Sequence, residues 1–175
     1  MTRDQLEHII RAACTIADDT ELVIMGSQAV LAQFSDAPEE MLVSIEADVY
    51  PRNHPERAEL IEGSIGELSM FHETFGYFAD GVTPDTATLP EGWEDRLVAI
   101  SGPGTAGNTG WALELHDLLI SKYVANREKD RLYTKAALAH GLAEVQTLEA
   151  RLACTSVDAA QRDRILSAID ADRTR

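Results

Sequence analysis

The sequence predicts an α+β fold in which a mixed sheet with flanking helices precedes a C-terminal helical bundle. Three observations support this: an amphipathic helical pattern at the start, short β-branched apolar stretches in the first hundred residues, and a continuous helical pattern after a glycine-rich segment. The chain has 175 residues, 45% of them hydrophobic, which suffices for one compact unit. We expect an α/β lobe over residues 1–101, a connection over 101–110 and a helical lobe over 111–175.

The first fifty residues alternate between helical and strand patterns. Apolar residues that recur every three or four positions indicate a helix, whereas short apolar runs bounded by turn-forming residues indicate strands. In chain order we expect a helix over Asp4–Ala17, a strand over Glu21–Met25, a turn at Gly26–Ser27, a helix over Gln28–Phe34 and a strand over Met41–Tyr50. Because proline cannot donate to a sheet ladder, Pro51 is expected to end this last strand.

The rest of the chain divides at the glycine-rich segment. Before it we expect a helix from Pro55 to about Glu67, a strand over Tyr77–Val82, and a further strand over either Thr86–Leu89 or Arg96–Ile100. The segment Ser101–Gly110 has four glycines and a proline, which predicts an irregular connection. After it we expect four helices, over Trp111–Asn126, Glu128–His140, Leu142–Cys154 and Asp158–Ala171.

Composition restricts the location and the partners of the protein. No window approaches the roughly 18 to 20 apolar residues that a bilayer span needs, and acids occur among the first residues. We therefore expect a cytoplasmic protein that is neither secreted nor membrane-bound. The formal net charge of −15 repels phosphate backbones, so a nucleic-acid partner would need a local basic surface. The one dense basic cluster, within residues 122–135, is interrupted by acids.

Two carboxylates carry the main functional signal. Side chains alternate along a strand, so Glu46 and Asp48 share one face while Ile45, Ala47 and Val49 share the other, which is expected to pack. Their Cα atoms would lie about 6.5 to 7 Å apart, close enough for both carboxylates to reach one magnesium-sized ion. The alternative is an exposed strand face whose acids only prevent aggregation at a sheet edge.

A glycine turn precedes this acidic strand by about 20 residues. Gly26 permits a positive φ and the close approach of a ligand, and the Ser27 hydroxyl is expected to cap the following helix. Free amides at that helix start would suit a nucleotide phosphate. The two features together predict a phosphate cradle beside a metal site, whereas a plain helix cap would explain the turn alone.

With these motifs the chain resembles the nucleotidyltransferase superfamily with the polymerase-beta-like fold. The residues that match are Ile24-Met25-Gly26-Ser27 and the acidic strand over Ser44–Tyr50. Within the superfamily it is most similar to the branch of abortive-infection and type IV toxin nucleotidyltransferases and their uncharacterised relatives. There a C-terminal helix carries a lysine followed by an arginine and a basic-Asp pair, which the segment Asp117–Asp130 matches.

The resemblance implies a metal-dependent transfer of a nucleoside monophosphate from a nucleoside triphosphate to an acceptor. It implies that Glu46 and Asp48 bind Mg²⁺ or Mn²⁺. Gly26 and Ser27 would bind phosphate, and Lys122, Arg127 and Asp130 would contact the triphosphate or the acceptor. The acceptor stays open between the 3′ end of a tRNA, a protein and a small molecule. The toxin branch also implies a cognate antitoxin or another partner protein.

Two departures from the superfamily pattern support an alternative function. The first carboxylate is Glu46 where the family motif has aspartate, and no third strand carboxylate is obvious, with Asp80 and Asp95 the nearest candidates. Ion pairing on a helix surface would also explain Lys122 and Asp130. The alternative is thus a catalytically degenerate binding or regulatory module that acts through a protein partner.

Overall fold

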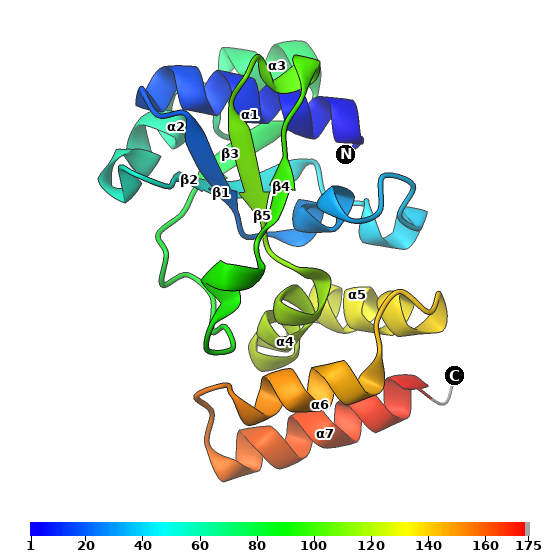
Figure 1. Ribbon diagram of the computed structural model, residues 1–175. Coiled ribbons are helices and arrows are strands. Elements are labelled where there is room, and N and C mark those ends of the chain that lie inside the picture. The colour runs from blue at the N-terminus through cyan, green and yellow to red at the C-terminus, as the bar shows by residue number, and fades with distance from the viewer. Residues whose placement is uncertain (174–175) are drawn as a thin grey trace.

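The structure, a computed structural model, describes residues 1–173 and confirms the α+β class (Figure 1). Its five-stranded sheet has the order β3-β2-β1-β5-β4. The strands span Glu21–Ile24 (β1), Glu46–Pro51 (β2), Phe78–Gly81 (β3), Val98–Ile100 (β4) and Thr109–Ala112 (β5). The sheet is mixed, because β1 is antiparallel to β2 but parallel to β5, while β2 is parallel to β3 and β4 antiparallel to β5.

Two helices cover one side of the sheet. Helix α1 (Arg3–Ala17) packs against β1, β2 and helix α2 (Ala58–Ile65), and α2 packs along β3. The periodic residues that predict α1 are its buried face, with Leu6, Ile9 and Ile10 fully buried. Thr2 begins this helix by accepting a hydrogen bond from the Gln5 amide, so the predicted amphipathic helix is confirmed.

Strand β5 overturns the predicted helix at Trp111. Residues 109–112 form the strand between β1 and β4, and α4 begins only at Leu115. A Cβ added at Gly110 would lie 2.6 Å from Cδ1 of Ile10, so glycine is required where α1 packs closely on this strand. A segment that reads as an irregular connection therefore leads directly into an inner strand of the sheet.

The acidic strand is shorter than predicted. Met41 belongs to a 3-10 turn (Glu39–Met41), and β2 starts only at Glu46. Ser44 is held instead by a side chain, since Nε2 of Gln28 donates to its carbonyl at 3.0 Å. Pro51 does end the strand, and it remains in register with Leu22 of β1.

Several other predicted boundaries change. The helix after the glycine turn is a 3-10 helix, η1 (Ser27–Ala32), and Pro55–Arg57 forms a 3-10 turn ahead of α2. Of the two alternatives for the later strand, Arg96–Ile100 is correct, although β4 covers only Val98–Ile100, and Thr86–Leu89 is not a strand. A short helix that the sequence analysis did not predict, α3 (Met70–Phe75), precedes β3.

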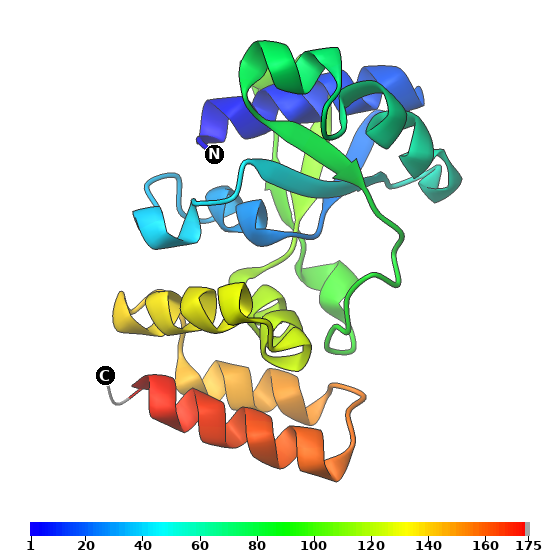
Figure 2. The ribbon, with the colours of Figure 1, turned by 180° about the vertical axis from the view of Figure 1, so that it is seen from behind.

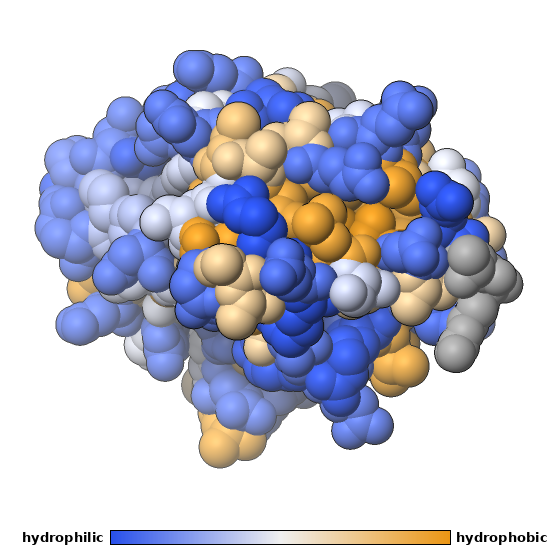
Figure 3. Space-filling view, turned by 90° about the horizontal axis from the view of Figure 1, so that it is seen from below, coloured by the Kyte–Doolittle hydropathy of each residue, from blue (hydrophilic) through white to orange (hydrophobic). Residues whose placement is uncertain are grey.

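The C-terminal helices form a separate layer below the sheet (Figure 2). They are α4 (Leu115–Ala125), α5 (Glu128–Ala139), α6 (Val145–Ala153) and α7 (Ala159–Arg173). Seen from below, their surface is mostly hydrophilic around a central apolar strip (Figure 3). Within residues 1–173, no helix has the length and apolar character needed to cross a bilayer.

A buried carboxylate ties this helical layer together. Asp117 of α4 has no exposed surface, and its oxygens accept from Nε and a terminal nitrogen of Arg96 at 2.8 and 3.1 Å. Arg151 of α6 adds an ion pair at 3.0 Å. The carboxylate therefore links the segment before β4, α4 and α6 through two cations.

We expect Asp117→Asn to lower the free energy of unfolding by about 3 kcal/mol, because two arginines would lose their buried counter-charge. Asp163→Asn, at an exposed position of α7, is the matched control and is expected to change stability by less than about 0.5 kcal/mol. Urea denaturation of both variants measures the difference. Equal stabilities would show that the buried carboxylate is not a structural link.

Candidate active site

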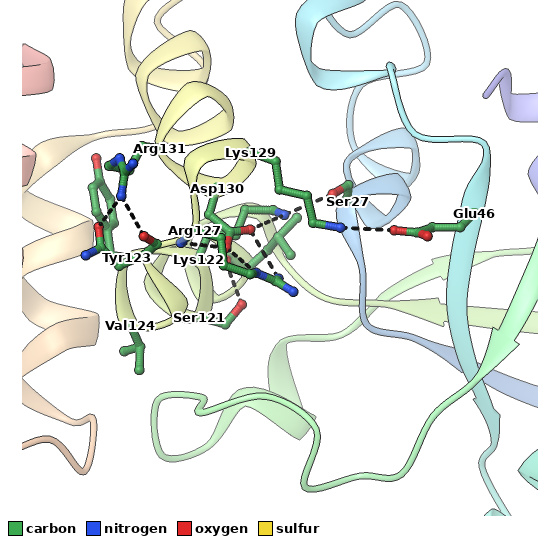
Figure 4. Close-up of polar contacts among 12 residues, drawn as sticks. Ser27, Glu46, Ser121, Lys122, Tyr123, Val124, Arg127, Lys129, Asp130 and Arg131 are labelled. Atoms are coloured by element: carbon green, nitrogen blue, oxygen red, sulfur yellow. Dashed lines mark hydrogen bonds and ion pairs between the residues drawn. The ribbon is translucent and has the colours of Figure 1, made fainter.

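A cleft of about 290 Å³ lies between the sheet and the helical layer. It opens where β1 ends at the glycine turn, beside the acidic face of β2, and α4 and the start of α5 close its other side (Figure 4). Its walls hold most of the predicted site residues, namely Gly26, Ser27, Glu46, Asp48, Lys122 and Arg127. Ser27 and Lys122, which lie 95 positions apart in the sequence, thus meet in one hollow.

The two carboxylates share the face of β2 that lines the cleft, as the alternation predicts. Ala47 and Val49 between and after them are fully buried on the opposite face. Burial raises the pKa of Asp48, and the neighbouring charge of Glu46 raises it further, although Lys122 partly offsets both. A carboxylate in this position is costly to ionise unless a cation lies close to it.

Gly26 is required for space and not for a special backbone conformation. Its φ of −90° is negative, so the expected positive φ is wrong. A Cβ at this position would lie 1.7 Å from Oδ2 of Asp48, and the amide of the preceding residue, Met25, donates to the Asp48 carbonyl at 2.9 Å. The turn and the acidic strand are therefore in direct contact, and only glycine permits it.

Ser27 has a different role from the predicted helix cap. The first turn of η1 has no side-chain cap, and the Ser27 hydroxyl accepts a hydrogen bond from Nζ of Lys122 at 2.9 Å. Its carbonyl accepts from the Tyr133 hydroxyl at 2.7 Å. The glycine turn is thus joined to both α4 and α5.

A buried carboxylate organises the basic side of the cleft. Asp130 has no exposed surface, and it accepts from Nε of Arg127 at 2.7 Å and from Nζ of Lys122 at 3.4 Å. Burial opposes ionisation of Asp130, but the hydrogen bond from Arg127 and the charge of Lys122 bring its pKa below the usual value. Burial lowers the pKa of Lys122, which the charge of Asp130 partly offsets.

The two cations differ in their surroundings. Lys122 is only 7% exposed and lies 4.3 Å from the centre of the Tyr133 ring, whereas the Arg127 side chain is 63% exposed. Both line the cleft. Lys122 is therefore a fixed charge at the floor of the cleft. Arg127 extends into solvent at the rim of the cleft, and Asp130 holds this side chain through the hydrogen bond from Nε.

Lys129 is a residue of the site that the predicted site residues do not include, although the motif matched by Asp117–Asp130 contains it as the basic member of its basic-Asp pair. Its Nζ lies 3.3 Å from Oε1 of Glu46, so it bridges the cleft from α5 to β2 (Figure 4). The Lys129 side chain is 63% exposed, and such surface pairs contribute little and separate easily. Nothing in the local sequence indicates which carboxylate it meets.

Asp80 is the nearest third carboxylate. It is in register with Asp48 on the neighbouring parallel strand, so both side chains project from the same face of the sheet. Burial and the charges of Glu46 and Asp48 raise the pKa of Asp80 to about 6. Asp95, the other candidate, is exposed in a 3-10 turn. Within the described part of the chain, no three acidic, histidine or cysteine side chains are grouped closely enough to form a metal site by themselves.

A family model for a nucleotidyltransferase of unknown function (DUF6036) matches residues 4–172 of the chain. The chain belongs to this family. Neither a curated protein nor a solved structure gives a significant match. Family membership therefore agrees with the glycine turn, the acidic strand and the basic helices that meet in the cleft.

The acidic face fits the divalent cation that nucleotidyltransferases typically use. Mg²⁺ is usually bound by one or two carboxylates and completes its shell with water and substrate phosphates, so Glu46 and Asp48 are a sufficient donor set. Burial and the charge of Glu46 raise the pKa of Asp48 despite Lys122 and the other nearby cations. Asp80 adds a further acid beside this pair.

Proposed function

We propose that this nucleotidyltransferase is an active enzyme that transfers a nucleoside monophosphate from a nucleoside triphosphate to a hydroxyl group of an acceptor. One observation carries the proposal: Lys122 and Arg127 line the same cleft as the paired carboxylates Glu46 and Asp48. Cations for a triphosphate and acids for a divalent ion on facing walls are what phosphoryl transfer requires.

In the proposed reaction the acceptor oxygen forms a bond to the α-phosphorus. The bond from that phosphorus to the bridging oxygen of the β-phosphate breaks, and pyrophosphate leaves with the electron pair. The hydroxyl proton passes to solvent. Little covalent chemistry is left for the protein, so its contribution is to position the groups and to stabilise charge.

Glu46 and Asp48 would hold the divalent ion. When bound, such an ion neutralises the charge that develops on the transferring phosphoryl group. Lys129, which pairs with Glu46 in this structure, is exposed enough to turn away from that carboxylate. Because Gly26 has no side chain, the Asp48 carboxylate has room to lie directly beside the glycine turn.

Lys122 and Arg127 would bind the β- and γ-phosphates. A buried ammonium gives a strong point charge, and a guanidinium can form two parallel hydrogen bonds to phosphate oxygens. Asp130 acts through them, since it accepts hydrogen bonds from both. The role of Asp130 is therefore to position the two cations.

A catalytically degenerate binding module is the second candidate, and one contact favours it. Lys129 neutralises Glu46, the residue that departs from the family motif, so this carboxylate already has a cation at 3.3 Å. The pair is solvent-exposed, however, and the pKa of Asp48 stays raised despite the same lysine. The balance of these observations supports the active enzyme.

The net charge of the chain is evidence about which acceptor the enzyme uses. The resemblance to toxin nucleotidyltransferases suggests a tRNA 3′ end and a role in a toxin-antitoxin pair. A net charge of −15 opposes the approach of a polyanion. We therefore favour an acceptor that is not a nucleic acid.

We expect Lys122→Met to weaken the binding of a nucleoside triphosphate by roughly ten- to a hundredfold, because a hydrogen bond to a charged group is worth about 1.5 to 3 kcal/mol. Titration calorimetry with Mg²⁺ and a non-hydrolysable triphosphate analogue measures the change. Lys135→Met replaces an exposed lysine of α5 outside the cleft lining and is the control, with affinity expected within twofold. Equal affinities for the Lys122 variant and the wild type would remove this lysine from the phosphate site.

A further inference from the structure

A second hollow, which we call the apolar groove, adjoins the cleft. Its volume is about 380 Å³, and it lies between the loop before β2 and helix α5. Its lining is mainly aliphatic and aromatic, in contrast to the charged cleft. The apolar residues that line it are Met41, Val43, Ile45, Leu132 and Tyr133.

Three of these side chains are exposed to a degree that folding does not explain. Val43 is 78% exposed, Ile45 46% and Leu132 62%. Ile45 was expected on the packed face of the acidic strand, but β2 begins one residue later and leaves it in the groove. Large exposed apolar side chains gathered at one place usually mark a binding surface.

The apolar groove and the cleft share a wall. Ser27, Glu46 and Lys129 line both hollows, and the Glu46–Lys129 ion pair forms the ridge between them. Lys122 and Arg127 line only the cleft. A triphosphate held by these two cations would therefore leave the groove free, and an occupant of the groove would sit beside the carboxylates.

The charge of the groove selects against a polyanion. Its lining holds two acids, Glu40 and Glu46, and one base, Lys129, on a chain with a net charge of −15. A nucleic acid in this place would meet repulsion at short and at long range. An uncharged or basic occupant with apolar side chains is complementary to it.

The groove is also too open to enclose a small molecule. Pockets for small ligands bury most of the ligand surface, whereas the three aliphatic walls here are 46% to 78% exposed. A side chain presented by a protein can fill such a groove, because the rest of the partner surface covers the walls. A polypeptide therefore fits the groove better than a metabolite.

We propose that the apolar groove binds the acceptor and that this acceptor is a segment of another protein. The segment places an aliphatic or aromatic side chain against Val43, Ile45 and Leu132 and a serine, threonine or tyrosine hydroxyl at the Glu46 ridge. That hydroxyl oxygen forms the bond to the α-phosphorus, pyrophosphate leaves, and the proton passes to solvent. The inference rests on the proposed function and names its acceptor class.

The test uses an equimolar mixture of four α-³²P-labelled nucleoside triphosphates, Mg²⁺ and two kinds of probe. One is a library of neutral or basic 15-residue peptides, each with one central serine, threonine or tyrosine. In half of the peptides this residue is flanked by leucine, isoleucine or phenylalanine, and in the other half it is flanked by glycine. The second is total tRNA. We expect the label in the peptides with apolar flanks, and little in the glycine half or in the tRNA.

Leu132→Gln tests the groove itself. We expect the KM for the apolar-flanked peptides to rise by roughly tenfold or more, since a leucine wall would no longer be buried by the peptide. The affinity for the triphosphate analogue should stay within twofold. Leu60→Gln is the matched control, because Leu60 is a 53% exposed leucine on α2 outside the groove lining.

Three outcomes would count against the inference. Label in the tRNA with unlabelled peptides would overturn it and leave the proposed function standing. Equal labelling of both peptide halves by the wild type and by Leu132→Gln would overturn the role of the groove. Triphosphate binding without label in any peptide would overturn the peptide acceptor. Absence of Mg²⁺-dependent triphosphate binding, by contrast, would contradict the proposed function itself.

Discussion

Asp48→Asn is expected to lower kcat/KM for nucleotidyl transfer by at least about a thousandfold. Asp48 lies against the glycine turn and lines the cleft, where burial raises its pKa. A neutral amide of the same size cannot hold a divalent ion, whose stabilisation of the developing charge is worth several kcal/mol. Label transfer from α-³²P nucleoside triphosphates measures the loss.

The same substitution should not destabilise the fold. Burial and the neighbouring Glu46 make the Asp48 charge costly, as the raised pKa shows, so asparagine should leave the thermal midpoint unchanged or raise it. Asp95→Asn, in an exposed turn, is the control and should keep full activity. Transfer activity that survives Asp48→Asn would remove this residue from the mechanism, and a large fall in the midpoint would make it a structural carboxylate.

Gly26→Ala is expected to reduce activity by about a hundredfold and to lower the free energy of unfolding by roughly 1 to 3 kcal/mol. The added Cβ would lie 1.7 Å from Oδ2 of Asp48, so either the carboxylate or the turn must move. A displacement of about 1 Å in a catalytic group costs on the order of a hundredfold in rate. Transfer assays and urea denaturation measure the two effects.

Gly63→Ala is the matched control for this substitution. Gly63 lies within α2, and no atom comes within 4 Å of a Cβ added there. Alanine should leave activity unchanged and stabilise the helix by about 0.5 to 1 kcal/mol. Full activity of Gly26→Ala would mean that the close contact with Asp48 is not needed for the reaction.

Local patterns alone placed much of the candidate site. The alternation along β2 depends only on strand geometry, so Glu46 and Asp48 could be assigned to one face without knowledge of the neighbouring strands. The order of a glycine turn, an acidic strand and a later lysine with an arginine and an aspartate was likewise readable in the sequence. The structure brings all of these except the aspartate into the lining of one cleft, and Asp130 is buried behind it, where it accepts from Lys122 and Arg127.

The errors arose where contacts distant in sequence determine the local structure. Strand β5 forms because residues 109–112 pair with β1 and β4, and Gly110 lies there because Ile10 of α1 leaves no room for a side chain. Such a requirement is invisible in the segment itself, where glycines indicate a turn. Tertiary pairing overrides local propensity in strands more readily than in helices.

The sequence by itself therefore established the α+β class, the acidic face of β2 and the basic residues of the C-terminal helices, because each follows from short-range periodicity or charge. Tertiary packing alone decided that Lys122 reaches Ser27, that Lys129 reaches Glu46 and that an apolar groove adjoins the cleft. These contacts join residues more than 80 positions apart. Side-chain partners at such separations depend on how the sheet and the helical layer pack together, which no local pattern contains.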